Sequence, residues 1–259
     1  MPASDLSLLI EAAQEAGRIA TRFAGASAQR WEKPQGAGPV TEADLAVNEM
    51  LHRDLMQARP DYGWLSEESP DDLARIGSER VFIVDPIDGT RSFIEGADTW
   101  AHALAVAERG EVTAAVIFLP LRGLLFTAAR GAGAHLNGVP IRASSLTNMA
   151  RSTILAAKPT MAPERWRDGI CPPFKPAYRP SLAYRLGLVA QAQFDAMLTL
   201  RPSWEWDIAA GALIVAEAGG TITNQRGAAL RFNGADPRLD GVVAGGTAIH
   251  KALIDGLIK

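Results

Sequence analysis

Apolar residues recur at helical spacing in two stretches near the start of the chain. In residues 4–23 they stand three or four positions apart, behind Ser4, a residue type that caps helix N-termini well. A second helix is predicted from Thr41 to Ala58, because its apolar face continues to that point and Pro60 ends the pattern. Both stretches are expected to pack on a core through one face.

The segment between these helices, residues 24–39, is rich in Gly, Ala, Pro and Gln and has no period, which predicts a loop. Lys33 lies in this loop. Two interpretations of Lys33 stay open, since a loop lysine is most often solvated but can also face a site.

Shorter apolar runs follow and predict strands. Residues 81–84 form a continuous branched and aromatic run, typical of a strand buried on both faces. Residues 62–65 form another short apolar segment of the same length. Residues 71–78 are polar and predict a solvated loop or short helix, in which Asp71 and Asp72 carry no special role.

Three further strand-like runs predict an antiparallel meander, residues 99–107, 112–119 and 124–128. Asn137-Gly138 is typical of a type I′ hairpin turn between short strands.

From about residue 150 the pattern changes to alternating strands and helices. The expected strands are 154–157, 194–200 and 242–244, and the expected helices are 163–168, 182–193, 204–218 and 248–257. A proline-rich connection is expected at 171–176. The pattern therefore predicts an N-terminal α+β half with an antiparallel sheet, residues 1–148, and a C-terminal α/β half, residues 149–259.

Composition excludes several classes of protein. The chain has 259 residues, 47% of them hydrophobic, and a net charge of −3, so it can bury a large core and offers no basic field for a nucleic acid polymer. Cys171 is the one cysteine, which excludes an intrachain disulfide and a cysteine-based zinc site. Without a basic N-terminal region or an apolar run of membrane-spanning length, a cytoplasmic location away from membranes is expected.

Candidate chemistry begins where the 81–84 strand ends. Asp85-Pro86-Ile87-Asp88-Gly89 places two acids on one bend, since Pro86 lacks an N–H and interrupts the strand ladder, while Gly89 permits a tight turn. Two carboxylates about 4 Å apart repel by about 1 kcal/mol in water and by more when buried. Such a pair favours a cation with oxygen ligands, most simply Mg²⁺.

Two more acids occur at the ends of regular elements. Glu67 follows the 62–65 strand, and Asp207 stands at the start of a helix, where capping alone would explain it. Taken with Asp85 and Asp88, they favour a site for two or three divalent ions. The alternative is that the four acids point into solvent independently.

Thr41 and Asp44 allow two interpretations as well. Their spacing fits an acidic variant of the capping box, which is purely structural. Alternatively, Asp44 orients a catalytic hydroxyl.

Four motifs together resemble the inositol monophosphatase family, over nearly the whole chain. They are 40–44 (VTEAD), 67–69 (EES), 85–90 (DPIDGT) and 206–211 (WDIAAG), in the family's order. The resemblance implies a five-layered αβαβα sandwich with the active site between its halves, and a Mg²⁺-dependent, lithium-sensitive phosphatase, commonly a homodimer. The finer pattern resembles the bacterial 3′(2′),5′-bisphosphate nucleotidase branch.

The resemblance also implies roles for particular residues. Gly89 and Thr90 match backbone N–H groups that hold the phosphate, Asp44 and Thr90 match a dyad that orients the attacking water, and Glu67 matches an acid that helps to deprotonate it. The matching metal ligands are Glu67, Asp85, the carbonyl of Ile87, Asp88 and Asp207.

The expected partner is a small phosphate monoester. If the substrate carries a second phosphate, cations beyond the metal cluster are needed, and candidate substrate residues are Arg91, Lys158, Arg185 and, from the nucleotidase-like pattern, Glu205. Residues 33–38 lack the aspartate that the nucleotidases usually carry there, which argues against the binding of a third ion by this loop. Adenosine 3′,5′-bisphosphate is the first substrate hypothesis; inositol 1-phosphate, another polyol phosphate or histidinol phosphate is the second; a catalytically silent metal or sugar-phosphate binding protein is a third.

Overall fold

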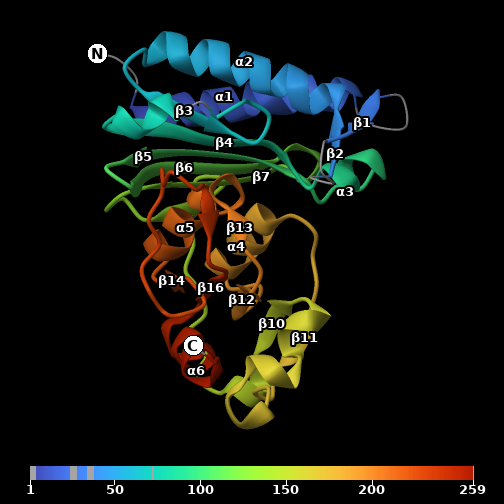
Figure 1. Ribbon diagram of the computed structural model, residues 1–259, viewed down its shortest axis with the longest axis vertical. Helices are drawn as coiled ribbons and strands as arrows, with labels where there is room; N and C mark the ends of the chain where they lie inside the picture. Colours follow the sequence, from blue (N-terminus) through green and yellow to red (C-terminus); the bar gives the residue numbers. More distant parts are fainter. Residues whose placement is uncertain (1–3, 24–27, 34–37, 72, 259) are drawn as a thin grey trace.

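A computed structural model describes residues 4–23, 28–33, 38–71 and 73–258, stacked in five layers (Figure 1). The first layer contains α1 (Asp5–Ala20) and α2 (Glu42–Ala58). A sheet lies beneath them, followed by α4 (Leu182–Ala190) and α5 (Glu205–Glu217), a second sheet, and α6 (Thr247–Gly256) with short 3-10 turns. The αβαβα sandwich expected from the resemblance is confirmed.

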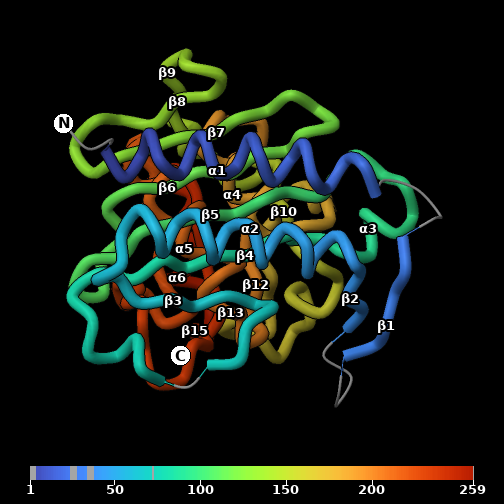
Figure 2. Tube along the Cα trace, turned by 90° about the horizontal axis from the view of Figure 1, so that it is seen from above, coloured from blue at the N-terminus to red at the C-terminus, as the bar shows by residue number. Residues whose placement is uncertain are grey.

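Within the described residues the first sheet has seven strands in chain order. They are β3 (Gly63–Ser66), β4 (Arg80–Asp88), β5 (Ala101–Glu108), β6 (Glu111–Leu119), β7 (Leu124–Ala129), β8 (Ala134–Leu136) and β9 (Val139–Pro140). All neighbours are antiparallel except β3 and β4, and Figure 2 shows β4, β5 and β6 running beneath α1 and α2. The predicted meander and the Asn137-Gly138 hairpin are confirmed.

The second sheet is mixed and has the order β11-β10-β12-β16-β14 among the described strands. These are β10 (Thr153–Ala156), β11 (Lys175–Ala177), β12 (Ala196–Thr199), β14 (Thr221–Thr223) and β16 (Val242–Gly245). The prediction missed β14 and treated 175–177 as a connection, because edge strands this short have no periodicity to read. The division of the chain at residue 148 stays a prediction.

Short elements complete the description. They are β1 (Arg30–Glu32), β2 (Pro39–Thr41), β13 (Ser203–Trp204), β15 (Arg238–Leu239), α3 (Thr90–Ile94), and the 3-10 turns at Thr21–Phe23, Ala74–Gly77, Pro120–Arg122, Met149–Arg151, Lys158–Met161, Pro163–Arg165 and Arg167–Gly169. The prediction of a loop over 24–39 is wrong where β1 pairs with β2. The prediction of a helix over 163–168 is also wrong, because two 3-10 turns lie there. Residues 24–27 and 34–37 of that loop, and Asp72, lie outside the described residues.

The expected solvated segment at 71–78 was also wrong in one respect. Arg75 is buried, with 2% of its surface exposed, and its guanidinium binds both carboxylate oxygens of Asp71. A charged residue inside this turn is tolerated because its donors are satisfied.

The two middle helices pack unusually closely, because α5 presents Gly211 to Leu186 of α4. A Cβ at Gly211 would lie 2.3 Å from Leu186 Cδ1 and 2.5 Å from its Cβ. This close approach fixes how α5 sits on α4, and therefore where the N-terminus of α5 lies.

We expect Gly211→Ala to destabilise the fold by about 1–3 kcal/mol, since the added methyl forces the helices apart. The measurement is urea unfolding followed by far-UV circular dichroism. Gly77→Ala is the matched control, because a Cβ there meets nothing within 4 Å, and its change should stay within about 0.5 kcal/mol. Equal stabilities for Gly211→Ala and wild type would contradict this account of the contact.

Candidate active site

The site is built around an irregularity near the end of β4. β4 pairs with β5 in register through Asp85, and the register then shifts before pairing resumes at Asp88. The strand therefore extends beyond Pro86, where the sequence predicted its ladder to end. The shift places both acids on the same short bend, as their spacing suggested, and both are buried.

His102 supports this bend, although it lies outside every sequence motif. Its Nδ1 stands 2.5 Å from the Pro86 carbonyl oxygen, and burial lowers the His102 pKa to about 4, so the ring is neutral. The neutral ring donates from Nδ1 to the carbonyl. A lone histidine inside the apolar run of β5 was the sequence feature that could have revealed it.

Two middle helices bring further groups to the bend. Asp207 lies in the first turn of α5, and one oxygen from each of Asp85, Asp88 and Asp207 lies within 4.8 Å of the others. Asp88 Oδ2 also accepts from Ser181 Oγ at 2.7 Å and from the Ala183 backbone N–H at 2.6 Å, at the start of α4. The predicted convergence of acids distant in sequence is therefore present for Asp85, Asp88 and Asp207, whereas Glu67, the fourth acid, is not part of this group.

The electrostatics of this acidic cluster of Asp85, Asp88 and Asp207 are unfavourable for three free carboxylates. Burial and the charges of Glu67 and Asp88 raise the pKa of Asp85 well above its usual value; burial and the charges of Asp88 and Glu67 do the same for Asp207. Burial raises the pKa of Asp88 to about 6 despite its two hydrogen bonds. Charge of this density calls for a counter-ion.

The surroundings of Asp85 indicate that this counter-ion is a metal ion. Both of its carboxylate oxygens are buried and have no hydrogen-bond partner among the described residues. Buried polar atoms are nearly always satisfied, and the atoms gathered here are all carboxylate oxygens, the ligand type of hard divalent cations. The residues thus fit a metal ion, and this set could bind one.

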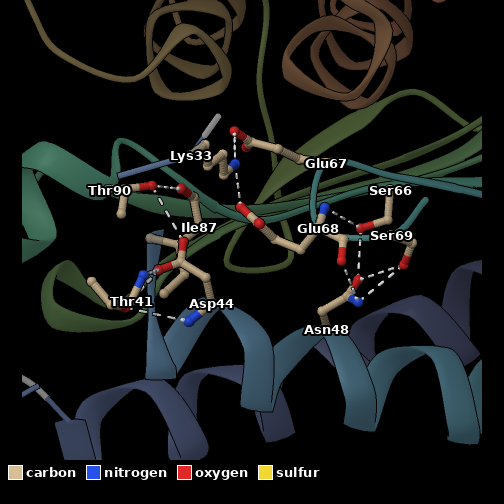
Figure 3. A network of polar contacts seen from close by, with 10 residues as sticks. All are labelled: Lys33, Thr41, Asp44, Asn48, Ser66, Glu67, Glu68, Ser69, Ile87 and Thr90. Atoms are coloured by element: carbon tan, nitrogen blue, oxygen red, sulfur yellow. Dashed lines mark hydrogen bonds and ion pairs between the residues drawn. The ribbon is translucent and has the colours of Figure 1, made fainter. Parts of the chain in front are cut away.

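Asp44 stands beside the bend in contact with Thr90 (Figure 3). Asp44 Oδ2 accepts from the Thr41 N–H at 2.8 Å and from Thr41 Oγ1 at 2.5 Å, while Thr90 Oγ1 lies 3.2 Å from Asp44 Oδ1 and 3.1 Å from the Ile87 carbonyl oxygen. The capping box is therefore confirmed, and the second oxygen of Asp44 is in contact with the Thr90 hydroxyl. The catalytic role of Asp44 stays a prediction. Burial raises the Asp44 pKa to about 6.

Lys33 faces the site and is not solvated. Its Nζ lies 2.7 Å from Glu67 Oε1 and 2.6 Å from Glu68 Oε1, with 14% of the side chain exposed (Figure 3). Burial opposes the charge on Lys33, yet the nearby Glu67 and Glu68 leave its pKa above the usual value. Burial and the charge of Glu67 raise the pKa of Glu68 to about 7. The sequence predicted no role for Glu68 and did not predict this ion pair, because Lys33 lies 34 and 35 positions away from the two glutamates in the chain.

The predicted substrate residues are placed very differently from one another. Arg185 is buried on α4, its guanidinium 4.6 Å from the Tyr178 ring centre, and Asp88 is among the charges that act on it. Arg91 and Lys158 are exposed, and no hydrogen bond or ion pair joins either to the acidic cluster in the described part of the chain. Glu205 is buried, and both of its oxygens accept backbone N–H groups.

Gly89 occupies the position between the bend and α3. Its φ of 101° and ψ of 38° lie in the left-handed region, which favours glycine. The turn that the sequence predicted at Gly89 is confirmed, and the short helix α3 begins at Thr90.

Comparison with known proteins agrees with this geometry. A model of the inositol monophosphatase family matches residues 2–259. An inositol-1-monophosphatase of Mesorhizobium japonicum is 30% identical over 263 residues, covering 98% of this chain and 96% of that protein. A 3′-phosphoadenosine 5′-phosphate phosphatase of Mycobacterium tuberculosis is 36% identical over 204 residues, covering 76% of this chain and 73% of that protein.

The solved structure of the extragenic suppressor protein SuhB from Bartonella henselae matches with a TM-score of 0.83 and 28% identity, covering 98% of each chain. Fold, acidic cluster and relatives together define a phosphoric monoester hydrolase. The chain belongs to the inositol monophosphatase family. Within the described ranges, no helix is both long enough and apolar enough to cross a membrane.

We expect Asp85→Asn to lower phosphatase activity more than about a hundredfold and to raise the melting temperature of the metal-free protein by roughly 5 °C. The amide removes an unpartnered buried charge and donates toward neighbouring carboxylates while the turn survives. Activity assays and differential scanning calorimetry after chelation measure the two effects. Near-normal turnover by this variant would contradict the role given to Asp85.

We expect Lys33→Met to tighten Mn²⁺ binding several-fold, because the ammonium no longer competes for the carboxylates of Glu67 and Glu68. The free-Mn²⁺ electron paramagnetic resonance signal measures the affinity. Lys175→Met, at an exposed lysine on β11, is the control. Weaker Mn²⁺ binding by Lys33→Met would mean that Lys33 supports the carboxylates in the metal-loaded site.

Proposed function

We propose that the protein is a Mg²⁺-dependent phosphomonoesterase that uses a metal-activated water and no covalent nucleophile. The observation that carries the proposal is Asp85, which is buried beside Asp88 and Asp207 and has no hydrogen-bond partner for either carboxylate oxygen in the described part of the chain. Two or three ions would be held by Glu67, Asp85, the Ile87 carbonyl, Asp88 and Asp207. Bound divalent ions would neutralise the phosphate, lower the pKa of the water and stabilise the leaving alkoxide.

The chain's own groups would position the reactants. The backbone N–H groups of Gly89 and Thr90 would hold the phosphate oxygens. Thr90 Oγ1 would accept a hydrogen bond from the attacking water while it donates to Asp44 Oδ1, 3.2 Å away. Glu67 would help to take the proton of that water. The reaction consumes one water and yields an alcohol and inorganic phosphate.

A bisphosphorylated nucleotide, adenosine 3′,5′-bisphosphate, is the proposed substrate. Support comes from the relative named 3′-phosphoadenosine 5′-phosphate phosphatase and from Arg185, a buried cation close enough to Asp88 for their charges to interact. The Arg185 guanidinium lies over the Tyr178 ring, and a guanidinium held in this way is suited to bind a second phosphate group of the substrate. Arg91 and Lys158 remain candidate substrate contacts, whereas both oxygens of Glu205 already accept backbone N–H groups inside the protein.

Other substrates have support of the same kind. Relatives carry the names inositol-1-monophosphatase and histidinol-phosphatase, so inositol 1-phosphate and histidinol phosphate are the second hypothesis. A silent binding protein has less support, because the intact contact between Asp44 and Thr90 serves no purpose in binding alone. The cytoplasmic location expected from the sequence, and the homodimeric state and lithium sensitivity expected from the resemblance, stay part of this proposal.

The test is phosphate release from a panel of adenosine 3′,5′-bisphosphate, inositol 1-phosphate, fructose 1,6-bisphosphate and histidinol phosphate, with Mg²⁺ and after chelation. We expect the nucleotide to have the highest kcat/KM and chelation to abolish release. Preference for another member of the panel would refute the nucleotide assignment alone, whereas no release from any member would refute the hydrolase.

Arg185→Ala should lower kcat/KM for the nucleotide by about tenfold or more and for inositol 1-phosphate much less, since only the nucleotide carries the second phosphate. Arg151→Ala, at an exposed arginine, is the control. Equal losses on both substrates would mean that Arg185 does not contact a second phosphate.

A further inference from the structure

A partly buried polar network joins the start of α5 to the 3-10 turn that follows β3. It begins at Arg75, which lies in the 3-10 turn Ala74–Gly77. The Arg75 side chain is 1% exposed, and its guanidinium donates to the two carboxylate oxygens of Asp71 at 3.0 and 2.6 Å. Arg75 Nη1 also donates to Asn233 Oδ1 at 2.7 Å, and Asn233 Nδ2 donates back to the Arg75 carbonyl oxygen at 3.2 Å. This reciprocal pair connects residues 158 positions apart.

Asn233 passes the connection to Glu205. The Asn233 N–H donates to Glu205 Oε2 at 2.6 Å, and the Gly234 N–H donates to Oε1 at 2.9 Å. Asn233 has a φ of 62°, a conformation that turns successive N–H groups toward one carboxylate. The Glu205 N–H donates in turn to the Pro237 carbonyl oxygen at 2.9 Å, so the residue is held by its side chain and its backbone.

One end of this network lies next to a proposed metal ligand, because Glu205 is the first residue of α5 and Asp207 is the third. The other end packs on the strand that leads to Glu67: a Cβ at Gly63, the first residue of β3, would lie 2.9 Å from Arg75 Cβ, and Glu67 directly follows the last residue of β3. Metal ions tolerate little error in ligand position, and partners behind the ligands commonly set that position.

We propose that Arg75, Asn233 and Glu205 are positioning residues that hold the start of α5, and with it Asp207, at a fixed distance from the segment carrying Glu67. The proposal rests on the proposed function, since it concerns the same metal site. It assigns Glu205 a role different from substrate contact, because both carboxylate oxygens already accept backbone N–H groups inside the protein.

The other end of α5 supplies a matched control. Glu217 also accepts two backbone N–H groups, from Gly131 and Gly133, each at 2.8 Å. It lies twelve residues from Glu205 on the same helix, which is about 18 Å along the axis. Glu217→Gln thus weakens the same kind of carboxylate-to-backbone hydrogen bonding far from Asp207.

The experiment measures Mn²⁺ affinity of the full chain by electron paramagnetic resonance, together with the melting temperature, for wild type, Glu205→Gln, Arg75→Lys and Glu217→Gln. Arg75→Lys keeps the charge but loses the planar fork, so it tests the network even if Glu205→Gln fails to fold. We expect roughly tenfold weaker Mn²⁺ binding in Glu205→Gln and Arg75→Lys and unchanged binding in Glu217→Gln. At saturating Mn²⁺, KM for the best substrate of the panel should be unchanged in the first two variants.

The outcomes separate the two proposals. If wild type itself fails to bind Mn²⁺, the proposed function is wrong and the positioning role falls with it. If wild type binds Mn²⁺ and Arg75→Lys binds it equally well, only the positioning role is wrong. A raised KM with unchanged Mn²⁺ affinity in Glu205→Gln would overturn it in favour of substrate contact. Equal weakening in Glu217→Gln would overturn it in favour of a general loss of stability.

Discussion

Mutual repulsion among buried carboxylates is the constraint on which the site depends. Asp85, Asp88 and Asp207 lie close together in a region where burial already disfavours their charged forms. Left free to relax, such groups would turn toward solvent or take up protons. They stay together because each belongs to an element fixed by the core, and that enforced proximity makes the cluster receptive to divalent cations.

Helix N-termini offset part of this repulsion. Asp44 and Asp207 lie in the first turns of α2 and α5, and Asp88 accepts an N–H at the start of α4. The exposed N–H groups and the positive end of the helix dipole favour negative charge at all three places. Helices from the first and middle layers therefore converge on the bend at the end of β4, and the five-layered architecture places their N-termini there.

Contacts between segments far apart in the chain also satisfy charges around the site. Lys33 reaches Glu67 and Glu68 from the loop after β1, and Arg75 reaches Asn233 across the two parts of the fold. Each contact satisfies a charge that is at least partly buried, so removal of one partner would leave the other charge unpaired at a cost in stability. In our proposal, the contact between Arg75 and Asn233 also sets the distance between proposed metal ligands.

The sequence by itself determined the longer regular elements and the acids of the candidate site. Periodicity predicted α1, α2 and the strands β4 to β7 because their apolar patterns are local and long, and the acids at Asp85, Asp88 and Asp207 stood out because each closes or opens such an element. Only the tertiary structure decided that Lys33 faces Glu67, that His102 braces the bend, and that Glu205 binds the Asn233 turn. These are pairings between side chains and distant backbone, which depend on how helices and sheets pack and leave no period in the chain.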